Sequence, residues 1–278
     1  MANNVVFSIS TQMEMEGRQL KAIKPNKDGV YTGIPLTLIG CNSRNNCSYT
    51  KDSVLKCITD AQSRFAANVG TGDMEGEWGH PLLEGNCLNR LLYIDRTRVS
   101  HFFTRVYGKD MGDGVIIIYG DVKPFGPYGK YLKESFEDPT RNTSFSLRSA
   151  AQNCGEKNGI VQKRMLSLVT FDAVDGPGFL KASKRFRDPD VATESFGIKL
   201  DPTNNYDVEM NVNKQQFVQS LESLKEAGQE SVITNQAILD AFECDKVILR
   251  DVVLTKGMHK QYSNGKKNVS VFDMCFRD

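Results

Sequence analysis

The sequence predicts an α+β protein whose main part is a mainly antiparallel, closed or half-closed β-barrel with helices packed on it. Stretches rich in apolar and β-branched residues alternate with turns from residue 5 to residue 174, and little of that region has helical spacing. The sequence then becomes rich in charged residues, and helical spacing returns closer to the C-terminus. We therefore expect a domain at residues 1–190 and a C-terminal α/β extension at residues 191–278, with the boundary near residue 190.

The first elements are two strands and a helix. Residues 5–9 alternate apolar with small side chains, and residues 30–39 are rich in β-branched side chains, so both are expected as strands. Thr50 can cap a helix whose apolar residues recur at helical spacing until Gly70 ends it. A glycine-rich polar loop at residues 71–89 follows.

The middle of the chain is expected to contain four more strands. Residues 98–107 and 115–122 are apolar stretches separated by a glycine-containing segment, which predicts a hairpin. A short helix is expected to begin at Pro127. Two further strands, at residues 143–150 and 161–174, would complete the sheet.

The C-terminal part begins with a charged stretch at residues 181–202, which indicates a linker or mobile loop because it lacks apolar periodicity. Residues 216–227 and 232–242 then show helical spacing. Strands are expected at residues 246–255 and 269–276.

Composition argues for an ordinary soluble protein that is not exported. The chain has 35 basic and 34 acidic residues, a net charge of +1, so bulk charge gives no reason to expect nucleic-acid or membrane binding. No apolar run is long enough to span a bilayer, and the first residues do not resemble a signal peptide. The cysteines are odd in number and include no CxxC pair, which favours reduced thiols in a cytosol over a zinc site or disulfides: Cys41, Cys47, Cys57, Cys87, Cys154, Cys244 and Cys275. We expect neither a metal ion nor a cofactor.

His80 is the most conspicuous candidate for chemistry. It is one of three histidines and lies in the segment GEWGHP at residues 76–81, next to the only tryptophan, Trp78. Histidine is suited to moving protons near neutral pH. A general base and a solvated turn histidine are both compatible with this segment.

Two predicted strands carry polar residues that need an explanation. Ser144, Ser146 and Arg148 fall on one face of a strand, which either lines a polar site or is the exposed face of an edge strand. Asp172 lies in a strongly apolar strand. It would need a partner such as a histidine N–H if buried, and none if it faces water.

These stretches, in order, resemble the prohead maturation proteases of tailed phages, a serine protease family that shares its fold with the herpesvirus assemblins. The resemblance rests on five segments: GEWGHP (76–81), IDRTRVSH (94–101), PYGKYL (127–132), FSLRS (145–149) and FDAVDGPG (171–178). It departs from the family pattern at Leu147, Ser149 and Gly178, and no motif is recognised after residue 190. The resemblance implies a herpesvirus-protease-like fold.

The resemblance also implies a catalytic triad. Ser146 would be the nucleophile, with Ser144 as the alternative on the same face. His80 would be the general base, and Asp172 would fix the tautomer of its ring. Arg148 would either serve the oxyanion, directly or through a water, or form a structural ion pair.

Two further residues are weaker candidates for the site. Asp95 lies in the second segment of the resemblance, and so does His101. The competing interpretation of His101 is a strand histidine that packs beside Phe102 and Phe103.

The family resemblance implies substrates and a place of action. We expect cleavage after Glu of phage scaffold, internal head and major capsid proteins, in the host cytoplasm inside the assembling prohead. Ala192 and Glu194 fit a small-x-Glu cleavage motif within the charged stretch, which predicts a zymogen that cleaves itself after Glu194. Similar triplets at residues 135–137 and 220–222 fall in expected helices. Oligomeric state and retention in the virion are left open.

Two rival interpretations belong to different classes of protein. A structural or scaffolding capsid component could keep the protease fold without turnover. A cysteine hydrolase could pair Cys87 or Cys154 with His80, although neither cysteine lies in a recognisable nucleophile motif.

Overall fold

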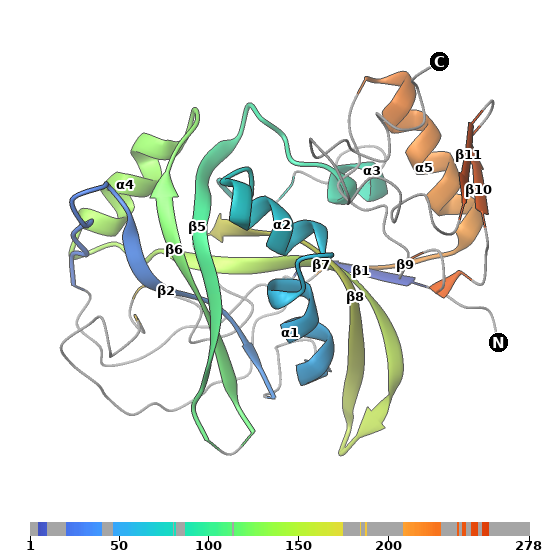
Figure 1. Cartoon of the computed structure of the whole chain (residues 1–278), viewed down its shortest axis with the longest axis horizontal. Coiled ribbons are helices and arrows are strands. Elements are labelled where there is room, and N and C mark those ends of the chain that lie inside the picture. Colours follow the sequence, from blue (N-terminus) through green and yellow to red (C-terminus); the bar gives the residue numbers. More distant parts are fainter. Residues whose placement is uncertain are drawn as a thin grey trace.

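Two β-sheets that pack on each other form the centre of the molecule (Figure 1). The computed structural model describes residues 5–9, 21–40, 47–79, 81, 87–112, 114–174, 184, 187, 208–228, 238, 241–242, 246–249 and 252–255. The first sheet has the strand order β3 (Cys47–Tyr49), β8 (Ile160–Val174), β7 (Ser144–Lys157), β1 (Val5–Ile9) and β9 (Val208–Val212). The second has the order β2 (Tyr31–Ile39), β6 (Ile116–Pro124), β5 (Val99–Asp110) and β4 (Glu75–Glu77). A separate hairpin joins β10 (Lys246–Leu249) to β11 (Val252–Thr255).

The mainly antiparallel α+β architecture is confirmed, and of the expected closed or half-closed barrel the closed form is not found in the described residues. Every strand pair in the two main sheets is antiparallel except β3 with β8. The sheets stay open because β4 is three residues long and is joined to β8 beyond its end by a single bridge, between Trp78 and Ala173. The likeness to the herpesvirus proteases stays a prediction.

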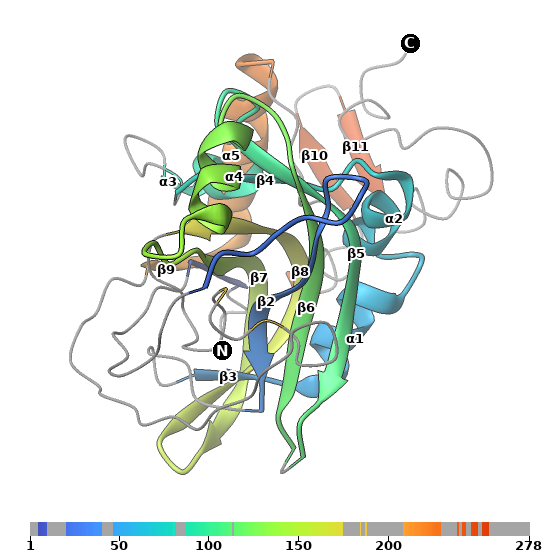
Figure 2. The same cartoon turned by 90° about the vertical axis from the view of Figure 1, so that its left-hand side faces the viewer.

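Five helices pack around the sheets in the described chain: α1 (Lys51–Thr59), α2 (Arg64–Thr71), α3 (Cys87–Leu92), α4 (Gly129–Glu137) and α5 (Lys214–Glu226). α1 and α2 lie against β8 and β5, while α4 lies at the end of the sheets away from α5, β10 and β11 (Figures 1 and 2). None of these helices is long and apolar enough to cross a membrane.

The single helix expected from Thr50 to Gly70 is two helices. The backbone becomes extended at Asp60, and Ser63 starts the second helix by accepting the N–H of Ala66 (3.1 Å). A side chain that caps a helix competes with continuation of the preceding one, which apolar periodicity alone does not reveal.

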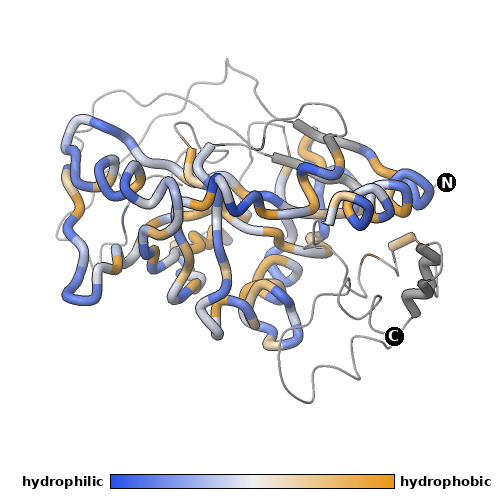
Figure 3. The backbone as a smooth tube through the Cα atoms, turned by 90° about the horizontal axis from the view of Figure 1, so that it is seen from above, coloured by the Kyte–Doolittle hydropathy of each residue, from blue (hydrophilic) through white to orange (hydrophobic). Residues whose placement is uncertain are grey.

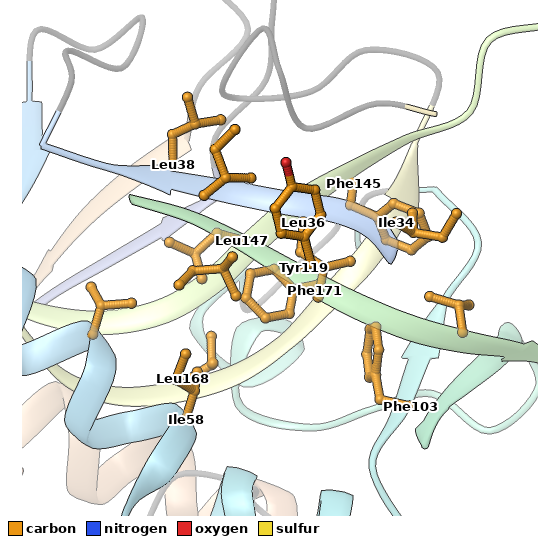
Figure 4. Close-up of a cluster of buried hydrophobic side chains, with 14 of the residues drawn as sticks. Ile34, Leu36, Leu38, Ile58, Phe103, Tyr119, Phe145, Leu147, Leu168 and Phe171 are labelled. Atoms are coloured by element: carbon orange, nitrogen blue, oxygen red, sulfur yellow. The ribbon is translucent and has the colours of Figure 1, made fainter. Parts of the chain in front are cut away.

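The hydrophobic core lies between the two sheets and under α1 and α2. Hydrophobic segments gather along the middle of the molecule, and hydrophilic ones lie at its outer turns (Figure 3). Phe145 and Leu147 from β7, Phe171 from β8, Phe103 from β5 and Ile34 from β2 all belong to this one buried cluster (Figure 4). One face of β7 and β8 is therefore committed to the core, which leaves the opposite face for different chemistry.

The C-terminal part of the chain contacts the sheet that contains β7. β9 pairs with β1, and β1 pairs with β7. α5 packs on α3, with the Asn89 side-chain amide donating to the Ser223 hydroxyl (2.9 Å). The division into residues 1–190 and 191–278 stays a prediction, but residues beyond 190 extend the central sheet.

The charged stretch expected to be a linker is anchored at the two positions that the structure describes. Lys184 is buried, and its ammonium donates to the carbonyls of Phe136 (3.4 Å) and Asp138 (2.7 Å) at the end of α4. Arg187 Nε donates to the carbonyl of Thr32 (2.7 Å). A cation at the carbonyl end of a helix is favourable, so Lys184 completes α4.

Several short elements were not expected from the sequence. β3, β4, α3 and β9 are each six residues or fewer, which gives periodicity little to detect. The expected strand at residues 246–255 is instead the β10–β11 hairpin. Most of the helix expected at 232–242, and the strand expected at 269–276, lie outside the described residues.

Candidate active site

Strand β7 carries polar side chains into the interior of the protein. β7 lies between β8 and β1, so it is not an edge strand. Ser144, Ser146 and Arg148 are at most 1% exposed, while Phe145 and Leu147 between them belong to the core. The predicted alternation is confirmed, and the interpretation as an exposed edge face is wrong.

Asp172 lies directly opposite Ser146 in the ladder between β7 and β8. Its carboxylate is buried and forms a bidentate pair with Arg148, from Nε to Oδ2 (2.9 Å) and from Nη2 to Oδ1 (2.7 Å). Oδ1 also accepts the backbone N–H of Glu77 (3.1 Å). Asp172 therefore does not face solvent, and Arg148 is the charged partner that a buried carboxylate requires.

Glu77, from the GEWGHP segment, is the centre of a buried ion network. It is 0% exposed and accepts hydrogen bonds from Arg148 Nη2 (2.9 Å), from Arg90 Nη1 (3.1 Å) and Nη2, and from the backbone N–H of Asp95 (2.9 Å). With Asp172, two carboxylates face two guanidinium groups, so the buried charges balance. Removing one member of such a network leaves an uncompensated charge, at a cost of about 3–5 kcal/mol.

The two buried carboxylates differ in how strongly they favour ionisation. Burial by itself would raise the pKa of Glu77, but the charges of Arg148 and Arg90 and the hydrogen bonds from Arg90 and Asp95 hold that pKa below its ordinary value. Burial, reinforced by the neighbouring charge of Glu77, raises the pKa of Asp172, although Arg148 opposes the shift. Glu77 is thus the more firmly ionised of the two.

The backbone that leads to His80 runs beside the end of β8. Trp78 and Ala173 form a bridge, and the N–H of Gly79 donates to the carbonyl of Ala173 (2.7 Å). Gly79 has φ 77°, in the left-handed region that favours glycine, so the chain turns just before the histidine. His80 lies outside the described residues, and the contacts of its ring stay a prediction.

His101, a weaker candidate for the base, is buried in the core. Its Nε2 lies 3.1 Å from the carbonyl of Phe171, which can only accept, so Nε2 carries the proton and Nδ1 accepts from the hydroxyl of Ser100 (2.8 Å). The ring packs edge-on against Phe103 and Phe145, whereas Phe102 pairs elsewhere. Burial lowers the pKa of His101 to about 3, against the opposing effect of its bond to Phe171. The core-packing interpretation is confirmed for Phe103 and wrong for Phe102.

Asp95 and Ser144 lie at different depths around the network. Asp95 begins the turn before β5, where its Oδ1 accepts the N–H (2.9 Å) and O–H (2.7 Å) of Thr97, and its Oδ2 lies 3.9 Å from Arg90 Nη2. Its carboxylate is thus at the rim of the network. Ser144 is buried and accepts a hydrogen bond from the side-chain amide of Asn142 (3.2 Å).

Arg148 uses all five of its N–H groups within the protein. Three serve Asp172 and Glu77, and Nη1 contacts the carbonyls of Tyr93 (2.8 Å) and Arg90 (3.4 Å). Although burial disfavours its charge, the two carboxylates raise the pKa of Arg148 above its ordinary value. These contacts support the structural ion-pair interpretation, and a role at the oxyanion stays a prediction.

The sequence did not identify Glu77 and Arg90 as parts of the site. Glu77 lies inside the GEWGHP segment, where a buried carboxylate could have been expected. Arg90 lies in α3, which is too short for helical spacing to indicate it. Among the described residues, no cluster of histidine, cysteine, aspartate and glutamate side chains could hold a metal ion.

Comparison with known proteins identifies the family. The family model described as the Peptidase S80 family matches residues 8–244, well over half of the chain. The chain belongs to the Peptidase S80 family. This family member is 28% identical over 195 residues to the capsid maturation protease of Pseudomonas phage phiKZ, covering 66% of this chain and 70% of that protein. The expected resemblance to phage head maturation proteases is confirmed.

A solved structure is also similar to this Peptidase S80 family member. The bacteriophage T4 capsid assembly protease, gp21, matches with a TM-score of 0.43 and 17% identity, covering 61% of this chain and 98% of the T4 chain.

Proposed function

We propose that the protein is a serine endopeptidase in which Ser146 attacks the scissile carbonyl. His80 takes the proton of the Ser146 hydroxyl and later delivers it to the leaving amine, and water then hydrolyses the acyl-enzyme. The observation that carries this proposal is that Ser146 faces Asp172 across two central strands, while the backbone that precedes His80 is hydrogen-bonded to the residue after Asp172.

Asp172 has the capacity to orient His80. Its Oδ1 accepts two hydrogen bonds, but its Oδ2 accepts one, from Arg148. A carboxylate oxygen can accept a second bond, which His80 Nδ1 would supply. We assign Arg148 the task of fixing Asp172 in this orientation, with direct contact to the oxyanion as the alternative.

We propose that the substrates are phage scaffold, internal head and major capsid proteins, cut after Glu inside the assembling prohead in the host cytoplasm. Membership of the Peptidase S80 family and the similarity to a phage capsid maturation protease support this proposal. No direct nucleic-acid or membrane contact and no metal ion or cofactor is required for the chemistry.

We propose that the chain is the zymogen form of the enzyme. Ser146 is 1% exposed, so a protein substrate cannot reach it without a rearrangement. We propose self-cleavage between Glu194 and the following residue, with Ala192 at the small position; both lie outside the described residues. Mass spectrometry of the wild type and of Ser146→Ala tests this step: identical intact masses would contradict it.

An active-site probe tests the nucleophile. A fluorophosphonate followed by peptide mapping should label Ser146 in the wild type and in Ser144→Ala, and should label nothing in Ser146→Ala. Labelling that is lost in Ser144→Ala instead would transfer the role to Ser144. Absence of both labelling and self-processing in the wild type would favour a scaffolding protein without turnover.

A thiol reagent addresses the cysteine hydrolase interpretation. Cys154 is exposed on the far part of β7, eight positions beyond Ser146, and its thiol donates to the carbonyl of Gln162 (3.3 Å). The side chain of Cys87 lies outside the described residues. A thiol-directed iodoacetamide should therefore leave peptidase activity unchanged, and inactivation by it would contradict the serine mechanism.

A further inference from the structure

We propose that Glu77 is a positioning residue that holds the backbone leading to His80 against the strand that carries Ser146. This inference rests on the proposed function, because it gives Glu77 a task in that same site. Glu77 precedes His80 by three positions, and its side chain bonds Arg148, which follows Ser146 by two positions on the same face of β7.

The backbone of Glu77 makes the second connection. Its N–H donates to Asp172 Oδ1 (3.1 Å) on β8, while its side chain accepts from Arg148 on β7, the strand of the proposed nucleophile. Two neighbouring bonds fix the same segment to β8: the hydroxyl of Thr170 donates to the carbonyl of Glu75 (2.6 Å), and the N–H of Gly79 donates to the carbonyl of Ala173.

The bonds just described tie β4 to β8, and backbone pairing ties it to β5, whereas the Glu77 carboxylate extends the connection to β7 and α3. It receives Arg148 from β7 and Arg90 from α3, and the Asp95 N–H from the turn before β5. Catalysis by a serine and a histidine depends on their relative placement, and a misplacement of 1 Å costs about 100-fold in rate. A carboxylate at this junction is therefore placed to set that geometry.

Neutralising Glu77 should weaken the connection of β4 to β7 and α3. Glutamine serves this purpose because its side chain has nearly the same shape as that of glutamate but carries no charge. In Glu77→Gln, Arg148 and Arg90 lose a shared carboxylate, and Asp172 is the buried carboxylate that remains. The matched control is Glu75→Gln, on the same strand, because the Glu75 side chain is half-buried and lies outside the ion network.

The experiment that tests this role measures two properties, in a Glu194→Gln background that blocks the proposed self-cleavage so that all variants have the same length. The first is the rate of fluorophosphonate reaction at Ser146, in the wild type, Glu77→Gln, Glu75→Gln, His80→Ala and the Glu77→Gln/His80→Ala double variant. We expect Glu77→Gln to react about 100-fold more slowly than the wild type, Glu75→Gln to react like the wild type, and the double variant to react no more slowly than His80→Ala. An equal loss from Glu77→Gln in both backgrounds would show a merely structural role and overturn the inference.

The second property is hydrogen exchange of the amides at residues 77–79, which does not depend on peptidase activity. It should be faster in Glu77→Gln than in Glu75→Gln, and equal exchange would overturn the inference. If Glu77→Gln does not fold, Glu77→Asp keeps the charge with a shorter reach, and should show a smaller loss of reactivity that still requires His80. Labelling of the wild type at a residue other than Ser146 would instead overturn the proposed function.

Discussion

His101 should make the folded protein less stable as the pH falls from 7 to 5. Its ring is fully buried, neutral and hydrogen-bonded through both nitrogens, and burial lowers its pKa from 6.5 to about 3. The folded state therefore binds fewer protons at this site than the unfolded state does. The stabilisation is complete above the unfolded pKa of 6.5 and is lost progressively as the pH decreases toward about 3.

The magnitude follows from the two pKa values. Each pH unit between them corresponds to about 1.4 kcal/mol, so the full loss below pH 3 is about 5 kcal/mol. Between pH 7 and pH 5, protonation of the unfolded histidine alone removes about 2 kcal/mol from the free energy of unfolding. A loss of this size is a large share of the net stability of a typical domain.

Urea unfolding at pH 7 and pH 5 measures this effect, in the Ser146→Ala background to prevent self-cleavage. His101→Gln keeps a donor for the Phe171 carbonyl but cannot titrate, so it should lose about 2 kcal/mol less than its parent over this range. The same loss in both proteins would refute the reasoning. A ring titration by NMR covers the case in which the variant does not fold: a midpoint above pH 5 would show that His101 is not held neutral by burial.

Two further predictions concern the network and the packing around it. Arg148→Met should lower the free energy of unfolding by about 3–5 kcal/mol, because it leaves two buried carboxylates without their shared partner. In the control Lys130→Met, at the exposed pair with Glu134, the loss should not exceed about 1 kcal/mol. Similar losses in the two variants would contradict the special role of burial. Gly76→Ala should cost about 1–3 kcal/mol, because its Cβ would fall within 2.5 Å of the His101 ring and the Phe171 carbonyl. Gly70→Ala, in a helix with open space around it, should instead stabilise the protein by about 0.5–1 kcal/mol. Thermal unfolding measures both glycine variants. A higher unfolding temperature for Gly76→Ala than for Gly70→Ala would contradict the packing around Gly76.

The longer elements could be predicted because their patterns are local. β1, β2, β5 to β8, α4 and α5 lie where alternation or helical spacing indicated them. α3 and β4 could not be predicted, since six residues contain less than two turns of helical spacing and three residues contain less than two periods of strand alternation. The closed barrel was wrong because a sheet closes only if its edge strands pair along their length, and β4 is too short to do so.

The sequence by itself determined which strand faces carry polar residues and which family the chain resembles. Ser146, Arg148 and Asp172 are polar within apolar strands, and side-chain alternation follows directly from backbone geometry. Only the tertiary structure decided how their charges are balanced. Glu77, Arg90, Arg148 and Asp172 come from four different elements. A buried charge takes whichever partner the fold brings within about 3 Å, and that choice is made by packing rather than by spacing along the chain.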